Sequence, residues 1–281
     1  MNLNSNMFGR RFTGFDLKLI ALITMLIDHI GAIFVWRLLV AANAANRALG
    51  AGIDLGPFAE LLLWVEANEV VIFTIYQIMR YIGRMAFPIY CFLLVEGFLH
   101  TRNVGKYALR LGVFALISEV PFDLALRGTV WAPTYNNVFF TLVIGLLLIW
   151  GVSYVEKFHE FWQEKQFDGF IGTVVALAMG GCMTAVAVVL AEKVLCTDYG
   201  MGGVLAILVL YLFRKNVYIA YTLAILILVV LSGKTEILAL LMLYPISHYD
   251  GSRGKNMKYI FYAFYPVHLL LLALLCMALG V

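Results

Sequence analysis

Long stretches of this chain carry no charged side chain, and this feature constrains its fold more than any other. An apolar run of about 18 residues or more can cross the hydrocarbon core of a bilayer as a helix. Because that core offers no water to the backbone, a spanning segment has to satisfy its own N–H and C=O groups. The sequence therefore predicts an all-α polytopic membrane protein, a bundle of about nine transmembrane helices with no soluble domain.

The expected spans use up most of the chain. They cover residues 15–37, 70–100, 105–126, 136–156, 170–192, 198–214, 216–232, 235–248 and 258–280. The second is too long for one straight crossing, so its first part is expected to tilt or to run along the outer surface. Nine helices of about 20 residues each leave only short loops and one longer insertion, so there is no room for an extramembrane catalytic domain. Charged residues make up only 13% of the chain, about half the share of a typical soluble domain.

The remaining segments complete a single transmembrane domain, residues 1–281. A polar tail, 1–14, precedes the first span, and 38–69, which contains several Asn and Gly residues, is expected to form one long outer loop. The four cysteines are scattered and none forms a CxxC pair, so no metal site and no disulfide is expected. The net charge of +3 is modest, and no nucleic-acid partner is expected.

The positions of Lys and Arg predict which side of the membrane each connection faces, because cytoplasmic loops are enriched in them. With nine spans and a cytoplasmic N-terminus, four basic clusters fall on the cytoplasmic side. These clusters are Arg10, Arg11 and Lys18; Arg102, Lys106 and Arg110; Arg214 and Lys215; and Arg253, Lys255 and Lys258. We therefore expect the N-terminus inside and the C-terminus outside.

Ionisable side chains within the apolar runs are candidate functional residues, because each costs at least about 2.5 kcal/mol at the centre of a membrane helix. Asp28 and His29 lie near mid-depth in the first span, and Lys18 precedes His29 on nearly the same helix face, about 16 Å away. His29 is either a catalytic base oriented by Asp28 or a structural histidine bonded to a neighbouring helix. Glu96 and His268 are further intramembrane candidates, and His268 is as deep as His29.

A second polar group is expected toward the outer half of the membrane. It comprises Arg80 and Arg84 in the second span, Glu119 and Asp123 in the third, Asn136 and Asn137 at the start of the fourth, and Asp198 and Tyr199 at the start of the sixth. Arginines and carboxylates at similar depth either neutralise one another as structural ion pairs or line a polar pocket that is reached from outside. Residue chemistry leaves both interpretations open.

The cytoplasmic connections have a basic character. Lys106 and Arg110 are one helical turn apart and point the same way, and Arg102 precedes them. Arg253 and Lys255 belong to a Gly-rich turn, and such a turn beside cations suits a phosphate-bearing ligand. The positive-inside signal alone would explain the same residues. A proton-coupled transporter would need much the same inventory, so these residues do not by themselves indicate an enzyme.

Several short motifs occur in order between about residues 15 and 275 of the chain. They are Ile27-Asp28-His29-Ile30-Gly31, Gly83-Arg84-Met85-Ala86-Phe87-Pro88, Glu96-Gly97-Phe98, His100-Thr101-Arg102-Asn103, Ser118-Glu119-Val120-Pro121-Phe122-Asp123, Asn137-Val138-Phe139-Phe140-Thr141-Leu142, Asp198-Tyr199-Gly200, Tyr249-Asp250-Gly251-Ser252-Arg253-Gly254 and Phe264-Tyr265-Pro266-Val267-His268-Leu269. This ordered set resembles the TraX family, which is named for F-type pilin N-acetylation. Its N-terminal part is also similar to the wider transmembrane acyltransferase superfamily.

The resemblance implies a membrane-bound acyltransferase that moves an acetyl group from cytoplasmic acetyl-CoA to an amine or hydroxyl acceptor at the membrane or its outer face. The acceptor would be a peptide such as a pilin N-terminus, a glycan or a lipid-linked substrate. The protein would reside in the bacterial cytoplasmic (inner) membrane. A proton-coupled transporter or flippase without acyl transfer is the alternative.

The resemblance also suggests roles for the candidate residues. His29 would act as general base with Asp28 orienting it, or would form a transient acyl-histidine, and Arg84, Asn136 or Asn137 would stabilise the oxyanion. The acyl-CoA would be held by Lys18, Arg102, Lys106, Arg110, Arg253 and Lys255. The acceptor pocket would be lined by Arg80, Glu119, Asp123, Asp198 and Tyr199.

Overall fold

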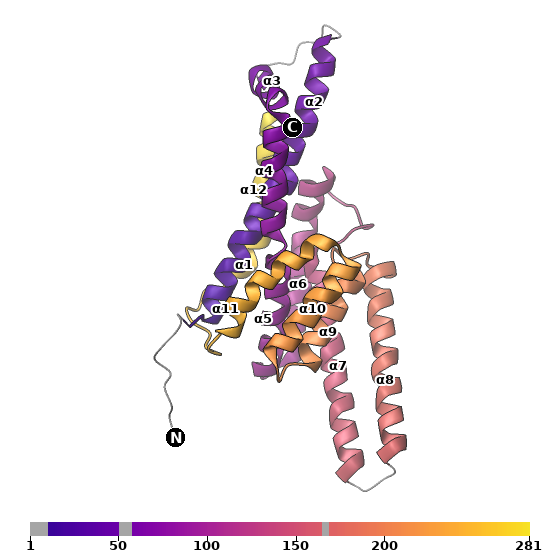
Figure 1. Cartoon of the computed structure of the whole chain (residues 1–281). Helices are drawn as coiled ribbons and strands as arrows, with labels where there is room; N and C mark the ends of the chain where they lie inside the picture. Colours follow the sequence, from indigo (N-terminus) through magenta and orange to yellow (C-terminus); the bar gives the residue numbers. More distant parts are fainter. Residues whose placement is uncertain (1–10, 51–57, 165–168) are drawn as a thin grey trace.

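The computed structural model describes residues 11–50, 58–164 and 169–281, and this part of the chain is helical almost throughout (Figure 1). The N-terminal half contains α1 (Gly14–His29), the π-helix η1 (Ile30–Val35), α2 (Trp36–Gly50), α3 (Ala59–Ala67), α4 (Glu69–Gly83), α5 (Ala86–His100) and α6 (Val104–Arg127). The C-terminal half contains α7 (Val138–Glu164), α8 (Gly169–Val189), the π-helix η3 (Leu190–Val194), α9 (Gly200–Leu212), α10 (Val217–Leu231), the 3-10 helix η4 (Lys234–Met242), α11 (Leu243–Ser247) and α12 (Lys258–Leu279).

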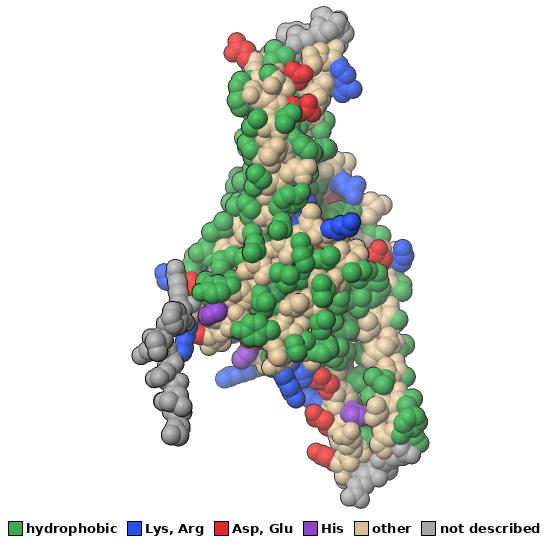
Figure 2. Space-filling model, in the orientation of Figure 1, with side chains coloured by type: hydrophobic (Ala, Val, Ile, Leu, Met, Phe, Trp, Pro, Cys, Tyr) green, Lys and Arg blue, Asp and Glu red, His purple; other side chains and the backbone are tan. Residues whose placement is uncertain are grey.

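The all-α class is confirmed, whereas the count of nine crossings is not. Among the described helices, those long and apolar enough to cross a membrane are Gly14–Ala48, Glu69–His100, Val138–Glu164, Gly169–Val194 and Tyr259–Leu279. Two shorter apolar helices are α9 and α10. Hydrophobic side chains cover much of the molecular face in Figure 2, and Lys and Arg side chains lie in groups beneath the central body, on its upper right side and near the top. Apolar helices of this length indicate a lipid bilayer environment.

Several helices begin where a polar side chain binds the free backbone N–H groups of the first turn. Thr13 and Asp16 form a capping box at the start of α1. Asn103 accepts a hydrogen bond from the Lys106 N–H at the start of α6, at a distance of 2.8 Å. Asn216 does the same for α10. These caps determine where the three helices begin, because a uniformly apolar sequence does not itself mark a helix start.

Residues 38–69 do not form the expected long loop; most of the described part is helical. α2 continues to Gly50 and α3 follows after residues 51–57, which lie outside the described residues. The Asn residues that suggested a loop instead bind neighbouring helices, since Asn43 donates to Glu69 of α4 and Asn46 to Glu66 of α3. Alanine-rich sequence favours helix, and a small core of Leu38, Leu39, Ala42 and Val65 joins α2 to α3. This arm projects beyond the rest of the bundle (Figure 1).

Two other expected spans are irregular. The second is divided between α4 and α5 by a break at Arg84 and Met85, four residues before Pro88, which has no N–H to donate to the Arg84 carbonyl. The eighth, 235–248, is not one regular α-helix but the 3-10 helix η4 followed by the short α11. Runs of 3-10 helix as long as η4 are uncommon, and they often mark strained or functional segments.

The helix packing brings distant segments of the chain together at the centre. α12 packs along α6 and also contacts η1 and α1, while α1 packs against α4 and α5. α9 contacts α5, α7 and α10, and α7 forms a hairpin with α8 (Figure 1). The first and last apolar helices are therefore neighbours, and the polar residues of α1, α4 and α12 converge where these helices meet.

Candidate active site

A histidine pair joins the first and last apolar helices. His29 Nδ1 lies 2.6 Å from His268 Nε2, although the two residues are 239 positions apart. Their rings stack with centroids 4.9 Å apart, and Tyr265 meets each ring edge-on at 5.8 Å. His29 is the last residue of α1 before the π-helix η1. Such π turns inside α-helices are frequent at functional sites, and here the turn begins directly after the candidate base.

A charged network lies beside the histidine pair and links α1, α4 and η4. Asp28 Oδ2 is 2.6 Å from Arg80 Nη1. Arg84 bridges two carboxylates, at 3.5 Å from Asp28 Oδ1 and 3.1 Å from Glu236 Oε1. Glu236 is fully buried. Two guanidinium groups thus face two carboxylates, and this balance is what makes charges tolerable away from water.

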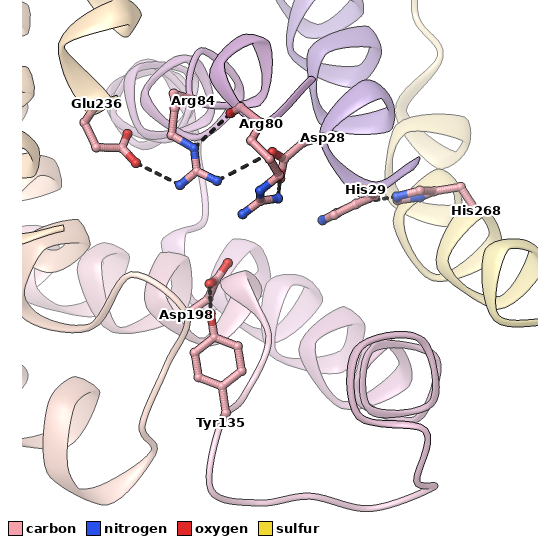
Figure 3. Close-up of polar contacts among 8 residues, drawn as sticks. All are labelled: Asp28, His29, Arg80, Arg84, Tyr135, Asp198, Glu236 and His268. Atoms are coloured by element: carbon pink, nitrogen blue, oxygen red, sulfur yellow. Dashed lines mark hydrogen bonds and ion pairs between the residues drawn. The ribbon is translucent and has the colours of Figure 1, made fainter. Parts of the chain in front are cut away.

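The close approach of α4 to α1 depends on a glycine. A Cβ atom on Gly83 would lie 2.1 Å from Asp28 Oδ1, well inside van der Waals contact. The missing side chain therefore allows the Asp28 carboxylate to lie directly against the α4 backbone and reach Arg80 and Arg84 (Figure 3).

A third polar element faces the arginines from the other side. Tyr135 donates a hydrogen bond to Asp198, and the Asp198 carboxylate points toward Arg80 and Arg84 (Figure 3). Backbone bonds hold this element in place, because Asn136 N–H donates to the Cys196 carbonyl and Asp198 N–H to the Asn136 carbonyl, both at 3.0 Å. Cys196 has a positive φ of 43°, an uncommon conformation for a residue with a side chain.

A cavity of about 410 Å³ extends from the basic connections toward the histidine pair. Its cationic lining residues are Lys18, Arg110, Arg253 and Lys255. The wall also includes Met25, one turn before His29, and Tyr265, whose ring contacts His29. We call this space the basic cavity. It connects a group of cations with the aromatic residue that touches both histidines.

The Gly-rich turn is fixed against the start of α1, and this places its cations at the cavity. Gly14 N–H donates to the Ser252 carbonyl at 2.8 Å, and a Cβ atom on Gly254 would clash with Thr13. Gly254 also has a positive φ of 63°, which glycine adopts without strain. Within the turn, hydrogen bonds from Ser252 hold the pKa of the Asp250 carboxyl below its usual range.

A second cavity, of about 390 Å³, opens beside the start of α9. Its polar lining includes Tyr135, Glu192, Thr197, Asp198 and Ser232, and Tyr199 completes the wall. We call this space the polar cavity. It meets the charged network at Asp198, whereas the basic cavity meets the histidine pair at Tyr265. The two cavities share none of the described lining residues, and each is lined by at least one residue of the polar groups described above.

The family model described as "TraX protein" matches residues 14–276, nearly the whole chain. The chain belongs to the TraX family. A curated relative, "Probable fimbrial assembly protein FimC, serogroup H1" of Dichelobacter nodosus, is 28% identical, and the match covers 95% of this chain and 96% of the relative. No solved structure matches the chain.

In this TraX protein Asp28 does not take the position expected for a residue that orients His29. Its carboxylate binds Arg80 and Arg84, and the nitrogen partner of His29 is His268. Consecutive residues of an α-helix point about 100° apart, so Asp28 and His29 face different neighbours. The ion-pair interpretation of the two arginines therefore describes their main contacts, with Asp28 and Glu236 as partners.

The three expected oxyanion donors of the TraX protein already have partners. Asn137 donates to the Ala115 carbonyl at 2.8 Å and to the Glu119 carboxylate. Asn136 donates to the Leu195 carbonyl, and Arg84 is held between its two carboxylates. These contacts give all three a structural function, and their role in chemistry stays a prediction.

The remaining expected residues divide between the two cavities and other sites. Of the phosphate candidates, Arg102 and Lys106 are exposed and do not line the basic cavity. Of the acceptor candidates, Asp198 and Tyr199 line the polar cavity, whereas Arg80 belongs to the charged network.

The other described candidates lie outside both cavities. Glu119 binds Asn137 and Asp123 accepts from Ala132 N–H, both in a separate α6–α7 cluster. Glu96 pairs with His100 at 3.7 Å, away from His29. Arg10 lies outside the described residues.

Three residues of this TraX protein were not anticipated as parts of the site: Glu236, Tyr135 and Tyr265. Glu236 lies inside an expected span, so the cost of a charge in the membrane could have identified it. Tyr265 precedes His268 by three positions and therefore shares its helix face. Tyr135 gave no signal beyond its place next to Asn136. Among the described residues, no group of three or more His, Cys, Asp and Glu is placed to hold a metal ion.

Proposed function

We propose that this protein is a membrane-bound acyltransferase that transfers an acetyl group from cytoplasmic acetyl-CoA to an amine or hydroxyl acceptor at the membrane or its outer face. The observation that carries the proposal is the basic cavity, which leads from four cations to the tyrosine in contact with His29. Phosphate groups bind well to Arg and Lys, so the cations suit the nucleotide end of CoA. The bacterial cytoplasmic membrane, with the N-terminus inside, is the location that fits this donor.

The basic cavity has the chemistry of a nucleotide site followed by a channel. Aromatic side chains in its lining, among them Tyr107, Phe261 and Tyr262, can stack on a base. Arg110 and Lys18 lie 5.9 and 5.8 Å from the ring centres of Tyr107 and Phe261, so the cations and the aromatic surface are adjacent. Eleven residues of helix, about 16 Å, separate Lys18 from His29, a span that an extended pantetheine arm can cover.

His29 is the proposed general base. It would take a proton from the acceptor amine or hydroxyl as this group attacks the thioester carbonyl of acetyl-CoA. The tetrahedral intermediate would then expel the CoA thiolate, leaving the acetyl group on the acceptor. The ring nitrogen of His29 that does not contact His268 faces the side of the site that holds Arg80 (Figure 3). A guanidinium at this position would stabilise the oxyanion of the intermediate.

The contact of His29 with a neighbouring helix also fits a purely structural histidine. What favours catalysis is its surroundings: Tyr265 lines the basic cavity, and Asp198, which faces the arginines, lines the polar cavity (Figure 3). A donor in the basic cavity would thus lie next to the histidine pair, and an acceptor in the polar cavity next to the charged network. The curated relative is named as a fimbrial assembly protein, which supports an exported peptide such as a pilin as the acceptor; a glycan or lipid-linked acceptor has the same nucleophile chemistry.

The test is an acetyl-CoA assay on purified protein in detergent. Labelled acetyl-CoA is supplied alone and with extracts of surface polymers and exported peptides, and both free CoA and labelled product are measured. We expect acceptor-dependent CoA release, and mass spectrometry of the product identifies the acceptor. If vesicles with the protein move a solute or lipid while no CoA is released under any condition, the protein is a transporter or flippase and the proposal is wrong.

A further inference from the structure

We propose that His268 is a positioning residue that fixes the tautomer of His29 and leaves the His29 Nε2 lone pair free toward the reacting centre. The inference rests on the proposed function for its catalytic consequence and on hydrogen-bond geometry for the tautomer itself. It depends on three groups in a row: the Phe264 carbonyl, the His268 ring and the His29 ring.

A backbone carbonyl of α12 determines which nitrogen of His268 carries the proton. His268 Nδ1 lies 2.7 Å from the Phe264 carbonyl oxygen, one turn earlier on α12. A carbonyl oxygen only accepts, so His268 Nδ1 must carry the proton. A neutral imidazole has one protonated nitrogen and one lone pair, so the lone pair of His268 is on Nε2.

The lone pair of His268 in turn determines which nitrogen of His29 carries the proton. His29 Nδ1 and His268 Nε2 are 2.6 Å apart, and one of the two must donate. Because His268 Nε2 holds a lone pair, His29 Nδ1 is the donor, and the His29 proton is on Nδ1. His29 Nε2 is then free to accept a proton. In most enzymes a carboxylate or a backbone carbonyl orients the basic histidine in this way; here a second histidine does so.

Both rings are neutral in this arrangement for a physical reason. His268 is only 5% exposed, so a charge on its ring would be buried, and a charge on the His29 ring would face Arg80 (Figure 3). The ring positions are also fixed by packing. Phe264 stacks on His268 with centroids 4.7 Å apart, and Tyr265 contacts both histidines edge-on. His268 therefore has little freedom to offer a different nitrogen to His29.

The hydrogen bond between the two histidines becomes stronger during the reaction. When His29 Nε2 takes up the acceptor proton, His29 becomes positively charged and still donates from Nδ1 to His268. That bond is then charge-assisted and stronger than in the resting state. An interaction that strengthens in the transition state raises turnover rather than donor affinity. Loss of His268 should therefore lower kcat and leave the KM for acetyl-CoA unchanged.

The kinetic test compares two substitutions of His268. His268→Leu removes the acceptor, and we expect kcat to fall by about 10²-fold or more, within the range of a lost general base, at an unchanged KM for acetyl-CoA. His268→Gln offers a carbonyl oxygen near the original Nε2, and we expect it to restore kcat to within about tenfold of the wild type. The matched control is Leu269→Ala, which truncates a fully buried neighbour on α12 without touching His29; its kcat should stay near wild type.

The tautomer is tested without any acetyl transfer. The protein contains five histidines, so ¹⁵N-histidine labelling gives a short spectrum, and the signals missing from His29→Ala identify His29. We expect wild-type His29 to carry its proton on Nδ1 with Nε2 bare, and His268→Leu to shift proton density to Nε2.

The two measurements separate the inference from the proposed function. If wild-type His29 carries its proton on Nε2, or if His268→Leu and His268→Gln have equal kcat values, the inference is overturned. If the tautomer is as expected but no acetyl-CoA is consumed, the pairing of the histidines stands and the acyltransferase proposal is what fails.

Discussion

At the scale of single residues, His29 has one nitrogen bound to His268 and one directed toward the charged network. A group that takes up the acceptor proton is predicted to be essential, and removal of a general base typically costs ~10²–10⁴-fold in rate. We expect His29→Ala to lose turnover by at least this lower bound, and His29→Gln to be nearly as poor because an amide does not take up a proton. Isothermal titration should show that both variants still bind CoA.

The control for this experiment has to lie away from the pair. His268 does not serve, since it contacts His29 directly. His159 suits better, because it bonds to Thr173 within the α7–α8 hairpin. If His159→Ala and His29→Ala have the same turnover, His29 is not the base.

Two basic residues of α6 differ in whether they reach the basic cavity. Arg110 lines the basic cavity, whereas Lys106, one turn earlier on α6, is exposed outside it. If the cavity holds CoA phosphates, Arg110→Gln should raise the KM for acetyl-CoA by ~10-fold, the equivalent of about 1.4 kcal/mol, with a smaller change in kcat. Lys106→Gln is the matched comparison on the same helix. Equal KM values in the two variants would mean that neither residue binds CoA and that both only reflect the enrichment of cations on the cytoplasmic side.

At the scale of elements, the α1–α4 contact controls the charged network. Gly83→Ala places a methyl group where the Asp28 carboxylate lies, and the helices or the carboxylate have to move. We expect a loss of about 1–3 kcal/mol in the free energy of unfolding, typical of overpacking, together with reduced activity as Asp28 leaves Arg80. Thermal unfolding in detergent measures the first effect and the acetyl-CoA assay the second.

A glycine elsewhere provides the comparison. Gly112 lies inside α6, and a Cβ atom there would meet nothing within 4 Å. Gly112→Ala should therefore leave stability unchanged or raise it slightly, because alanine favours the helix. A stability loss as large as that of Gly83→Ala would show that the α1–α4 contact is not special.

At the scale of the whole molecule, the ends of the described chain are far apart. α1 begins near the Gly-rich turn, whereas Val281 packs against the small core of the α2–α3 arm (Figure 1). With the basic clusters on one side, we predict a cytoplasmic N-terminus and an outer C-terminus. Reporter fusions after Lys215 and after Val281 should give opposite readings, and identical readings would rule out the nine-span topology.

The sequence by itself determined the helical class and the membrane setting. Backbone hydrogen bonding within a helix is local, so an apolar run specifies its own structure without reference to other segments. The free-energy cost of a buried charge likewise drew attention to Asp28, His29 and His268 before their partners were known. The ordered motifs led to the TraX family, which the family comparison confirms over residues 14–276.

The tertiary structure alone decided which of these residues meet. The partner of His29 lies 239 positions away, and Glu236 reaches Arg84 from an irregular 3-10 helix. The α2–α3 arm is helical because packing and interhelical Asn–Glu bonds outweigh the loop tendency of its Asn residues. Contacts between helices depend on how side chains fit across the bundle rather than on spacing along the chain. Arg110 and Lys106 are both cations on one turn of α6, yet Arg110 lines the basic cavity and Lys106 is exposed outside it.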